Sequence, residues 1–209
     1  MTTVPLSEQQ GHQLAMARSA ANDAIRAVAL QRDRIKDRDD DAHFAAAGFR
    51  QEVDVAFMLI ALRWLRETCQ LVAELTGDGA LTQALSDFDR KLPDARDLRD
   101  VREHIRVYLT GQGRLQADKT APDRLVSIAS LDSRTWLGHE ELSHFIWAGK
   151  EIQLDAALPV AERLFQAMQE TIKPYVVHDE QGRDIGIRVQ PLRSRTRAPN
   201  SPSLRGWRA

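Results

Sequence analysis

Residues 49–72 read FRQEVDVAFMLIALRWLRETCQLV, and this apolar stretch decides the fold. Apolar side chains recur along it at the three- and four-residue spacing of an amphipathic helix, but on two faces rather than one. One stripe consists of Phe49, Val53, Phe57, Ile60 and Trp64, and the other of Met58, Leu62, Leu65, Cys69 and Val72. A helix with two apolar faces contacts several neighbours, so we expect a central helix over residues 41–75 of an α-helical bundle.

The same helical spacing predicts the neighbours of this central helix. Apolar residues favour a long helix over residues 7–36, a short one over 81–88 and a last one over 156–172. Asp41 and Asp155 are the expected N-caps of the central and last helices, because a carboxylate accepts from the free amides of a first turn. These segments predict a bundle.

A further helix is expected between Asp94 and Gly111, because aspartate often begins a helix and glycine often ends one. Asp97, three residues after Asp94, completes a variant of the capping box in which Asp replaces Glu or Gln. The face expected to be buried consists of Leu98, Val101, Ile105, Tyr108 and Leu109. This is the helix that contains the candidate site.

The spacing of apolar residues changes between the helix expected after Asp94 and the last helix, over residues 156–172. Residues 125–129 predict a strand, residues 145–154 a hairpin, and residues 175–189 a second hairpin after the last helix. The fold class predicted for residues 1–190 is therefore mainly α. We expect a helical bundle with a small β-hairpin insertion, at about 125–154, before the last long helix.

Residues 191–209 differ in composition from the rest of the chain. They contain five arginines and no acid, together with Pro and Ser, which predicts a disordered tail. Because the formal charge of the 209-residue chain is −1, residues 1–190 have a net charge of −6. An acidic body argues against broad nonspecific binding to nucleic acid, although a small local basic site is compatible with it.

Cysteine content and hydropathy indicate the cellular compartment in which the protein is expected. Cys69 is the single cysteine, so an intrachain disulfide is excluded, which fits a reducing compartment, and its apolar helical setting predicts a buried structural thiol. Residues 1–10 lack a signal-peptide pattern, and the apolar run 55–62 is too short to span a bilayer. We therefore expect a cytoplasmic protein without a membrane contact.

The candidate site lies in the run Leu98-Arg99-Asp100-Val101-Arg102-Glu103-His104-Ile105. His is the side chain whose charge changes near neutral pH, and Arg can bind a phosphate through two parallel hydrogen bonds. Together they suggest chemistry on a phosphodiester without a metal. On a regular helix Asp100 and His104 share a flank and can hydrogen-bond, which would orient the imidazole.

Arg99 lies about 140° around such a helix from His104. Convergence of the two side chains then requires a long Arg that wraps around the helix, or a second copy of the helix supplied by a symmetric dimer. The simpler alternative is a routine surface ion pair, for example between Arg99 and Glu103.

The run from Arg99 to His104 resembles the Arg-polar-xxx-His signature of the HEPN superfamily, whose members are small α-helical bundles that often form dimers. The order of the helices is similar as well, since the signature lies near the start of a late helix after two long ones. The resemblance is strongest over residues 98–113. It implies a HEPN-like bundle and a homodimer.

Many HEPN proteins are metal-independent RNases of toxin–antitoxin, antiviral-defence and CRISPR systems. The resemblance therefore implies an endoribonuclease of toxin or defence type, with RNA as substrate and no cofactor. It assigns catalytic roles to Arg99, Asp100 and His104: His104 takes a proton from a ribose 2′-hydroxyl, Arg99 stabilises charge on phosphorus, and Asp100 orients His104.

Two other functions stay open. In a non-catalytic HEPN-like interaction module, the same three residues form a structural ion-pair network. An antitoxin or immunity partner of another protein is favoured if the C-terminal tail becomes ordered only against that protein. Exposure of Arg99 and His104 in a cleft distinguishes the endoribonuclease from the interaction module and from the antitoxin or immunity partner.

The sequence offers no competing metal site. Residues 139–144 read HEELSH, but the two histidines are five residues apart rather than four, so they do not share a helix face as a zincin motif requires. We expect no bound metal there.

Overall fold

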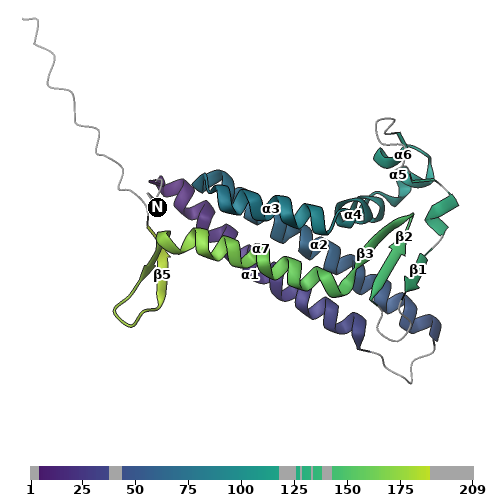
Figure 1. Ribbon diagram of the computed structural model, residues 1–209, viewed down its shortest axis with the longest axis horizontal. Helices are drawn as coiled ribbons and strands as arrows, with labels where there is room; N and C mark the ends of the chain where they lie inside the picture. Colours follow the sequence, from purple (N-terminus) through teal and green to yellow (C-terminus); the bar gives the residue numbers. More distant parts are fainter. Residues whose placement is uncertain are drawn as a thin grey trace, which may run out of the picture.

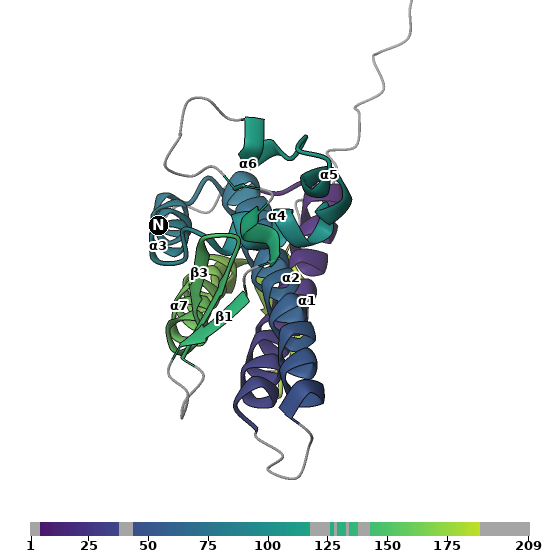
Figure 2. The same cartoon turned by 90° about the vertical axis from the view of Figure 1, so that its right-hand side faces the viewer.

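The computed structural model describes residues 5–37, 44–117, 126–127, 129–132, 134–137 and 143–188; for residues 44–49, 117, 129, 132 and 135–137 it describes the backbone alone. Its two longest helices, α1 (Glu8–Lys36) and α2 (Phe44–Thr76), lie side by side along the molecule (Figures 1 and 2). The first helix was expected at these residues, and Ser7 and Gln10 form a reciprocal capping box at its start. The predicted cap Asp41 lies outside the described residues.

Two further helices complete the bundle. α3 (Gly79–Lys91) and α7 (Leu154–Ile172) pack against each other, and α7 also packs on α1 and α2 (Figure 1). Asp78 caps α3 through the amides of residues 80 and 81, and its second carboxylate oxygen accepts a 3.2 Å hydrogen bond from the Thr171 hydroxyl. One core of buried side chains runs through all four helices. The fold class is as predicted.

Cys69 of α2 belongs to this core. Its side chain is fully buried, and burial raises the pKa of the thiol to about 12. The expected structural thiol is confirmed.

The two predicted apolar stripes of α2 differ in how far they are buried. Met58, Leu62 and Leu65 are buried, as expected for a central helix. Phe57 and Trp64, from the other stripe, are 54% and 58% exposed. The prediction that both faces contact neighbours is therefore wrong for this part of the described chain, and an apolar face of α2 is left open.

The helix predicted between Asp94 and Gly111 is broken in two. α4 (Ala95–Glu103) ends at His104, whose backbone has φ −117° and ψ 28°, and α5 (Ile105–Leu109) follows at once. Of the face expected to be buried, Leu98, Val101 and Tyr108 are buried, whereas Ile105 and Leu109 are exposed. The break lets Tyr108 enter the core beside α6 (Arg114–Ala117).

A three-stranded antiparallel sheet precedes α7. Its order is β1 (Arg134–Leu137), β2 (His144–Trp147) and β3 (Lys150–Gln153). The hairpin predicted at 145–154 is confirmed. It turns through Ala148 and Gly149, both with positive φ, as hairpins with two-residue loops require.

The strand predicted over residues 125–129 is wrong. Val126 and Ser127 have no regular structure and a 3₁₀ turn, η2 (Ala129–Asp132), follows; residues 125 and 128 lie outside the described chain. The Trp147 indole N–H donates a 2.9 Å hydrogen bond to the Leu131 carbonyl. That bond fixes the turn against the sheet, and the strand forms five residues further on, as β1.

Two of the predicted helix caps differ from expectation. Asp94 is the N-cap residue of α4, as predicted, but its side chain makes no cap bond, so the box with Asp97 does not form. The cap predicted at Asp155 is wrong, because Asp155 lies inside the first turn of α7. Both carboxylates bind lysines from distant segments instead: Asp94 lies near Lys150 of β3 and Asp155 pairs with Lys36 of α1.

The second hairpin is confirmed at the opposite end of the molecule from α5 (Figure 1). After a 3₁₀ turn, η3 (Lys173–Tyr175), it consists of β4 (Val176–His178) and β5 (Asp184–Ile187). Asp184 pairs with Arg18 of α1. The predicted tail, residues 191–209, lies outside the described residues. Along the described ranges, none of the helices is both long and apolar enough to cross a bilayer.

Candidate functional site

Arg99 lies on the face of α4 that packs against α2. Its Nη1 donates a 2.7 Å hydrogen bond to Oε2 of Glu103, one turn later, and the same oxygen is 3.5 Å from Nη1 of Arg63 on α2. The side chain is 14% exposed, and its Nε is buried without a hydrogen-bond partner. The ion pair with Glu103 expected as the simpler alternative is therefore present, but it leaves one donor of Arg99 unused.

The Asp100 carboxylate contacts Tyr108 and Arg114 rather than the expected His104. Its Oδ2 accepts a 2.6 Å hydrogen bond from the Tyr108 hydroxyl and lies 3.4 Å from Nε of Arg114. Burial and this carboxylate raise the pKa of Tyr108 to about 12. The predicted hydrogen bond between Asp100 and His104 is not formed, because the helix breaks at His104 and Tyr108 takes the carboxylate.

His104 marks the break itself. Its amide donates to the Asp100 carbonyl (3.1 Å), and its carbonyl accepts from the amides of Val107 (2.8 Å) and Tyr108 (3.2 Å). The imidazole is exposed, and within the described ranges it has no hydrogen-bond or ion-pair partner. The backbone of His104 is thus fixed while its side chain stays open to solvent.

A buried ion-pair cluster anchors α4 to the sheet behind the site. The Asp97 carboxylate, 1% exposed, lies 3.0 Å from Arg114 and 3.6 Å from Lys150, itself only 6% exposed. The Glu151 amide donates a 3.1 Å hydrogen bond to Asp94. The buried pair of Asp97 and Lys150, together with the Asp94 bond, thus links α4 to β3.

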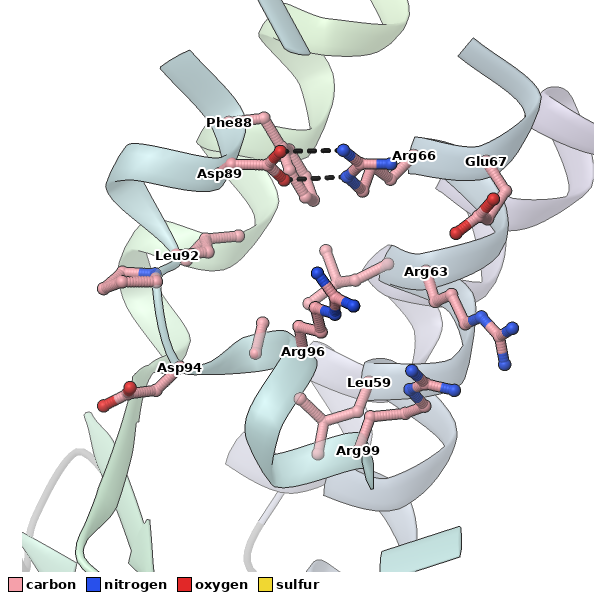
Figure 3. Close-up of a pocket in the computed structure, with 13 residues that line it drawn as sticks. Leu59, Arg63, Arg66, Glu67, Phe88, Asp89, Leu92, Asp94, Arg96 and Arg99 are labelled. Carbon is pink, nitrogen blue, oxygen red and sulfur yellow. Dashed lines mark hydrogen bonds and ion pairs between the residues drawn. The ribbon is translucent and has the colours of Figure 1, made fainter. Parts of the chain in front are cut away.

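A cavity of about 750 Å³ opens beside Arg99, between α2, α3 and the start of α4 (Figure 3). Four arginines line it, Arg63 and Arg66 from α2 and Arg96 and Arg99 from α4. Neither Asp100 nor His104 is among the lining residues. In one copy of the chain, therefore, Arg99 faces this cavity and His104 does not.

Sequence reasoning missed three of these four arginines. Their spacing is visible in the sequence. Arg63 and Arg66 lie three residues apart on the long apolar helix, and Arg96 and Arg99 lie three residues apart on α4. Residues three apart share a helix face. Two such pairs can face each other only if their helices pack, which spacing alone does not establish.

The HEELSH segment does not form a zinc site in the part of it that the structure describes. His144 begins β2, and its Nδ1 pairs with Glu151 on β3; residues 138–142 lie outside the described ranges. Within those ranges, no three His, Cys, Asp or Glu side chains are grouped so as to hold a metal ion.

Comparison of the chain with protein-family models, with curated proteins and with solved structures found no match.

Proposed function

We propose that this protein is a metal-independent endoribonuclease that acts as a homodimer. The observation that carries the proposal is the open imidazole of His104, five residues after an arginine with an unused donor. An imidazole can accept and release a proton near neutral pH, and a guanidinium stabilises charge that develops on a phosphate.

The proposed reaction needs only these groups and the RNA. His104 takes the proton of a ribose 2′-hydroxyl, the 2′-oxygen bonds to the adjacent phosphorus, and the bond from phosphorus to the 5′-oxygen breaks. Arg99 stabilises the negative charge on the phosphoryl oxygens. The leaving oxygen takes a proton from His104 of the second copy, giving a 2′,3′-cyclic phosphate and a 5′-hydroxyl. Asp100 has no direct role, since Tyr108 and Arg114 hold its carboxylate.

A second copy is needed because Arg99 and His104 face different ways in one chain. Exposed apolar side chains follow His104 directly on α5 (Ile105, Val107 and Leu109), and others lie on α2 (Phe57 and Trp64). The contact between Arg63 and Glu103 joins α2 to the end of α4, next to His104. Because exposed apolar side chains mark protein contacts, we place these residues in the two-fold interface of a homodimer, with the two His104 segments at its centre.

A toxin or defence nuclease is the setting we propose for this activity, and an antitoxin would then be its second protein partner. An RNase that needs no metal ion is active wherever it folds, so its control falls to a binding partner that covers the site.

A non-catalytic interaction module is the second candidate, and a specific observation favours it. Arg99 is paired with Glu103, and Asp100 is held by Tyr108 and Arg114, which is the ion-pair network that a structural role predicts. In that case the apolar patch around His104 binds a partner without any chemistry.

The experiment that separates the two candidates uses a random-sequence RNA pool and DNA of the same sequences, with EDTA present. The nuclease proposal predicts cut RNA with 2′,3′-cyclic phosphate ends and intact DNA, because DNA lacks the 2′-hydroxyl. Intact RNA, or cutting that requires a divalent metal, would leave the interaction module as the better account.

A further inference from the structure

The short helix α5 lies at one end of the molecule and presents an apolar strip (Figures 1 and 2). Three of its aliphatic side chains are exposed, and Tyr108 is the one residue of α5 that is buried. Together with two arginines of the same segment they form what we call the α5 surface: Arg102, Ile105, Arg106, Val107 and Leu109. Exposed aliphatic side chains next to one another are available to a protein partner.

Both arginines of the α5 surface have unused donors. In the described part of the chain, neither Arg102 nor Arg106 forms a hydrogen bond or an ion pair. Arg106 is exposed and Arg102 is half-buried. Burial lowers the pKa of Arg102, and the nearby Arg134 lowers it further, against the effect of Glu52. Since a half-buried charge without a hydrogen-bonded partner is costly, an added carboxylate would stabilise Arg102.

The acidic residues nearest to the α5 surface are engaged elsewhere. Glu52 accepts a 2.7 Å hydrogen bond from Arg134. Asp100 accepts from the Tyr108 hydroxyl, and Oε2 of Glu103 accepts from an arginine of its own helix. The α5 surface is therefore cationic, although residues 1–190 together have a net charge of −6.

We infer that the α5 surface binds an acidic amphipathic segment of a protein partner. Carboxylates of this segment pair with Arg102 and Arg106, and its apolar side chains cover the three aliphatic side chains of α5. Protein interfaces combine an apolar centre with arginine and with charges of opposite sign on the two partners. The α5 surface supplies the apolar and the positive part of such an interface, so its partner must supply the negative part.

A protein segment fits this surface better than RNA does. Interfaces with nucleic acid are more polar and much more positively charged than one in which aliphatic side chains outnumber arginines. The acidic body of the chain also disfavours a polyanion. RNA is therefore the occupant that the test has to distinguish from an acidic protein segment.

The inference deepens the proposed function, and its regulatory consequence rests on that function. The proposed homodimer covers the α5 surface with a second copy, which brings arginines of like charge together, whereas an acidic segment neutralises them and so competes with the second copy. Because His104 directly precedes α5, a bound segment also covers the imidazole. Binding of the segment itself needs neither a dimer nor RNA, so the two proposals can fail separately.

The test measures peptide binding to the full-length protein by calorimetry, with no RNA present. One probe is a synthetic amphipathic helix of Glu and Leu, and the matched probe has Lys in place of every Glu. We expect the Glu peptide to bind and the Lys peptide to bind far more weakly. Arg106→Glu should weaken binding of the Glu peptide at least about tenfold, because like charges then face each other. Since Arg106 is exposed and unpaired in the described chain, this variant should fold normally.

The matched control is Arg188→Glu, which makes the same change of charge directly after β5, at the opposite end of the molecule from α5 (Figure 1). It should bind the Glu peptide like the wild type. A third probe, a short 2′-O-methyl RNA, resists cleavage by 2′-hydroxyl attack and reports binding of nucleic acid alone.

Sedimentation tests the competition, since saturating Glu peptide should convert a wild-type dimer into monomers. A wild type that is monomeric from the start but binds the Glu peptide would refute the dimer and support the inference. Equal binding of the Glu and Lys peptides, an equal loss in Arg188→Glu, a dimer unchanged by bound peptide, or binding of the RNA probe without the Glu peptide would overturn the inference.

Discussion

The Tyr108 hydroxyl donates a 2.6 Å hydrogen bond to Oδ2 of Asp100 and accepts a 3.3 Å bond from the Leu115 amide. These two bonds join α4, α5 and α6 across the break at His104. The geometry of the candidate site therefore depends on a buried tyrosine that takes no part in the proposed chemistry.

Tyr108→Phe removes the hydroxyl and keeps the ring. We expect it to lower the free energy of unfolding by about 2 kcal/mol, because a buried hydrogen bond to a charged group is lost. Urea unfolding followed by circular dichroism measures this. Tyr175→Phe is the control, since in the described chain the Tyr175 hydroxyl has no partner, and a similar loss in that variant would contradict the account.

The same bond predicts a pH dependence. The folded pKa of Tyr108 is about 12, above its ordinary value of 10.0, so the protonated hydroxyl stabilises the fold fully below pH 10. This stabilisation is lost as the pH rises from 10 towards 12, because the unfolded chain releases the proton first. The stability difference between wild type and Tyr108→Phe should narrow over that range. A difference that stays constant up to pH 12 would show that the bond does not set this pKa.

Gly113 approaches the Tyr108 ring so closely that a side chain has no room. A Cβ at this position would lie 2.3 Å from the nearest ring carbon, whereas one at Gly79 would meet nothing within 4 Å. We expect Gly113→Ala to destabilise the protein by about 1–3 kcal/mol through overpacking. Gly79→Ala, at the start of α3, should be neutral or slightly stabilising. Equal thermal stability of the two variants would argue against this packing.

The periodicity of apolar residues was enough to predict much of this fold. Helical spacing places the two long helices and the last helix, whose apolar side chains enter one core, and the change of period places both hairpins. The side-chain cap bonds expected of Asp94 and Asp155 do not form, and helical spacing could not predict this. Their carboxylates pair with Lys150 and Lys36, which lie far along the chain, and a tertiary ion pair replaced the local cap.

The site was predictable only in part. Arg99, Asp100 and His104 lie on one short segment, but the helix breaks at His104, and Tyr108 bonds to Asp100, eight residues earlier, across that break. No helical periodicity indicates such a break. The arginines of the cavity come together because α2 and α4 pack, and their spacing within each helix gives no information about that packing.

Trp64→Glu tests the proposed dimer. Because the Trp64 side chain is 58% exposed, its replacement should leave the fold intact and place a charge in the apolar patch. We expect the wild type to sediment at twice 23.6 kDa and Trp64→Glu as a monomer with little RNase activity. Ile185→Glu, on β5 at the other end of the molecule and equally exposed, should remain dimeric (Figure 1). A wild-type protein that is monomeric at all concentrations would rule out the composite site.

The most direct test of the central claim compares RNA cleavage by the wild type, His104→Ala and His12→Ala in the presence of EDTA. His12 is an exposed histidine on α1, so its loss controls for the change in composition. The account predicts that the wild type and His12→Ala cut RNA to 2′,3′-cyclic phosphate ends, and that His104→Ala lowers the rate at least about a hundredfold, as expected for removal of a general base. Cleavage by His104→Ala at the wild-type rate would contradict it.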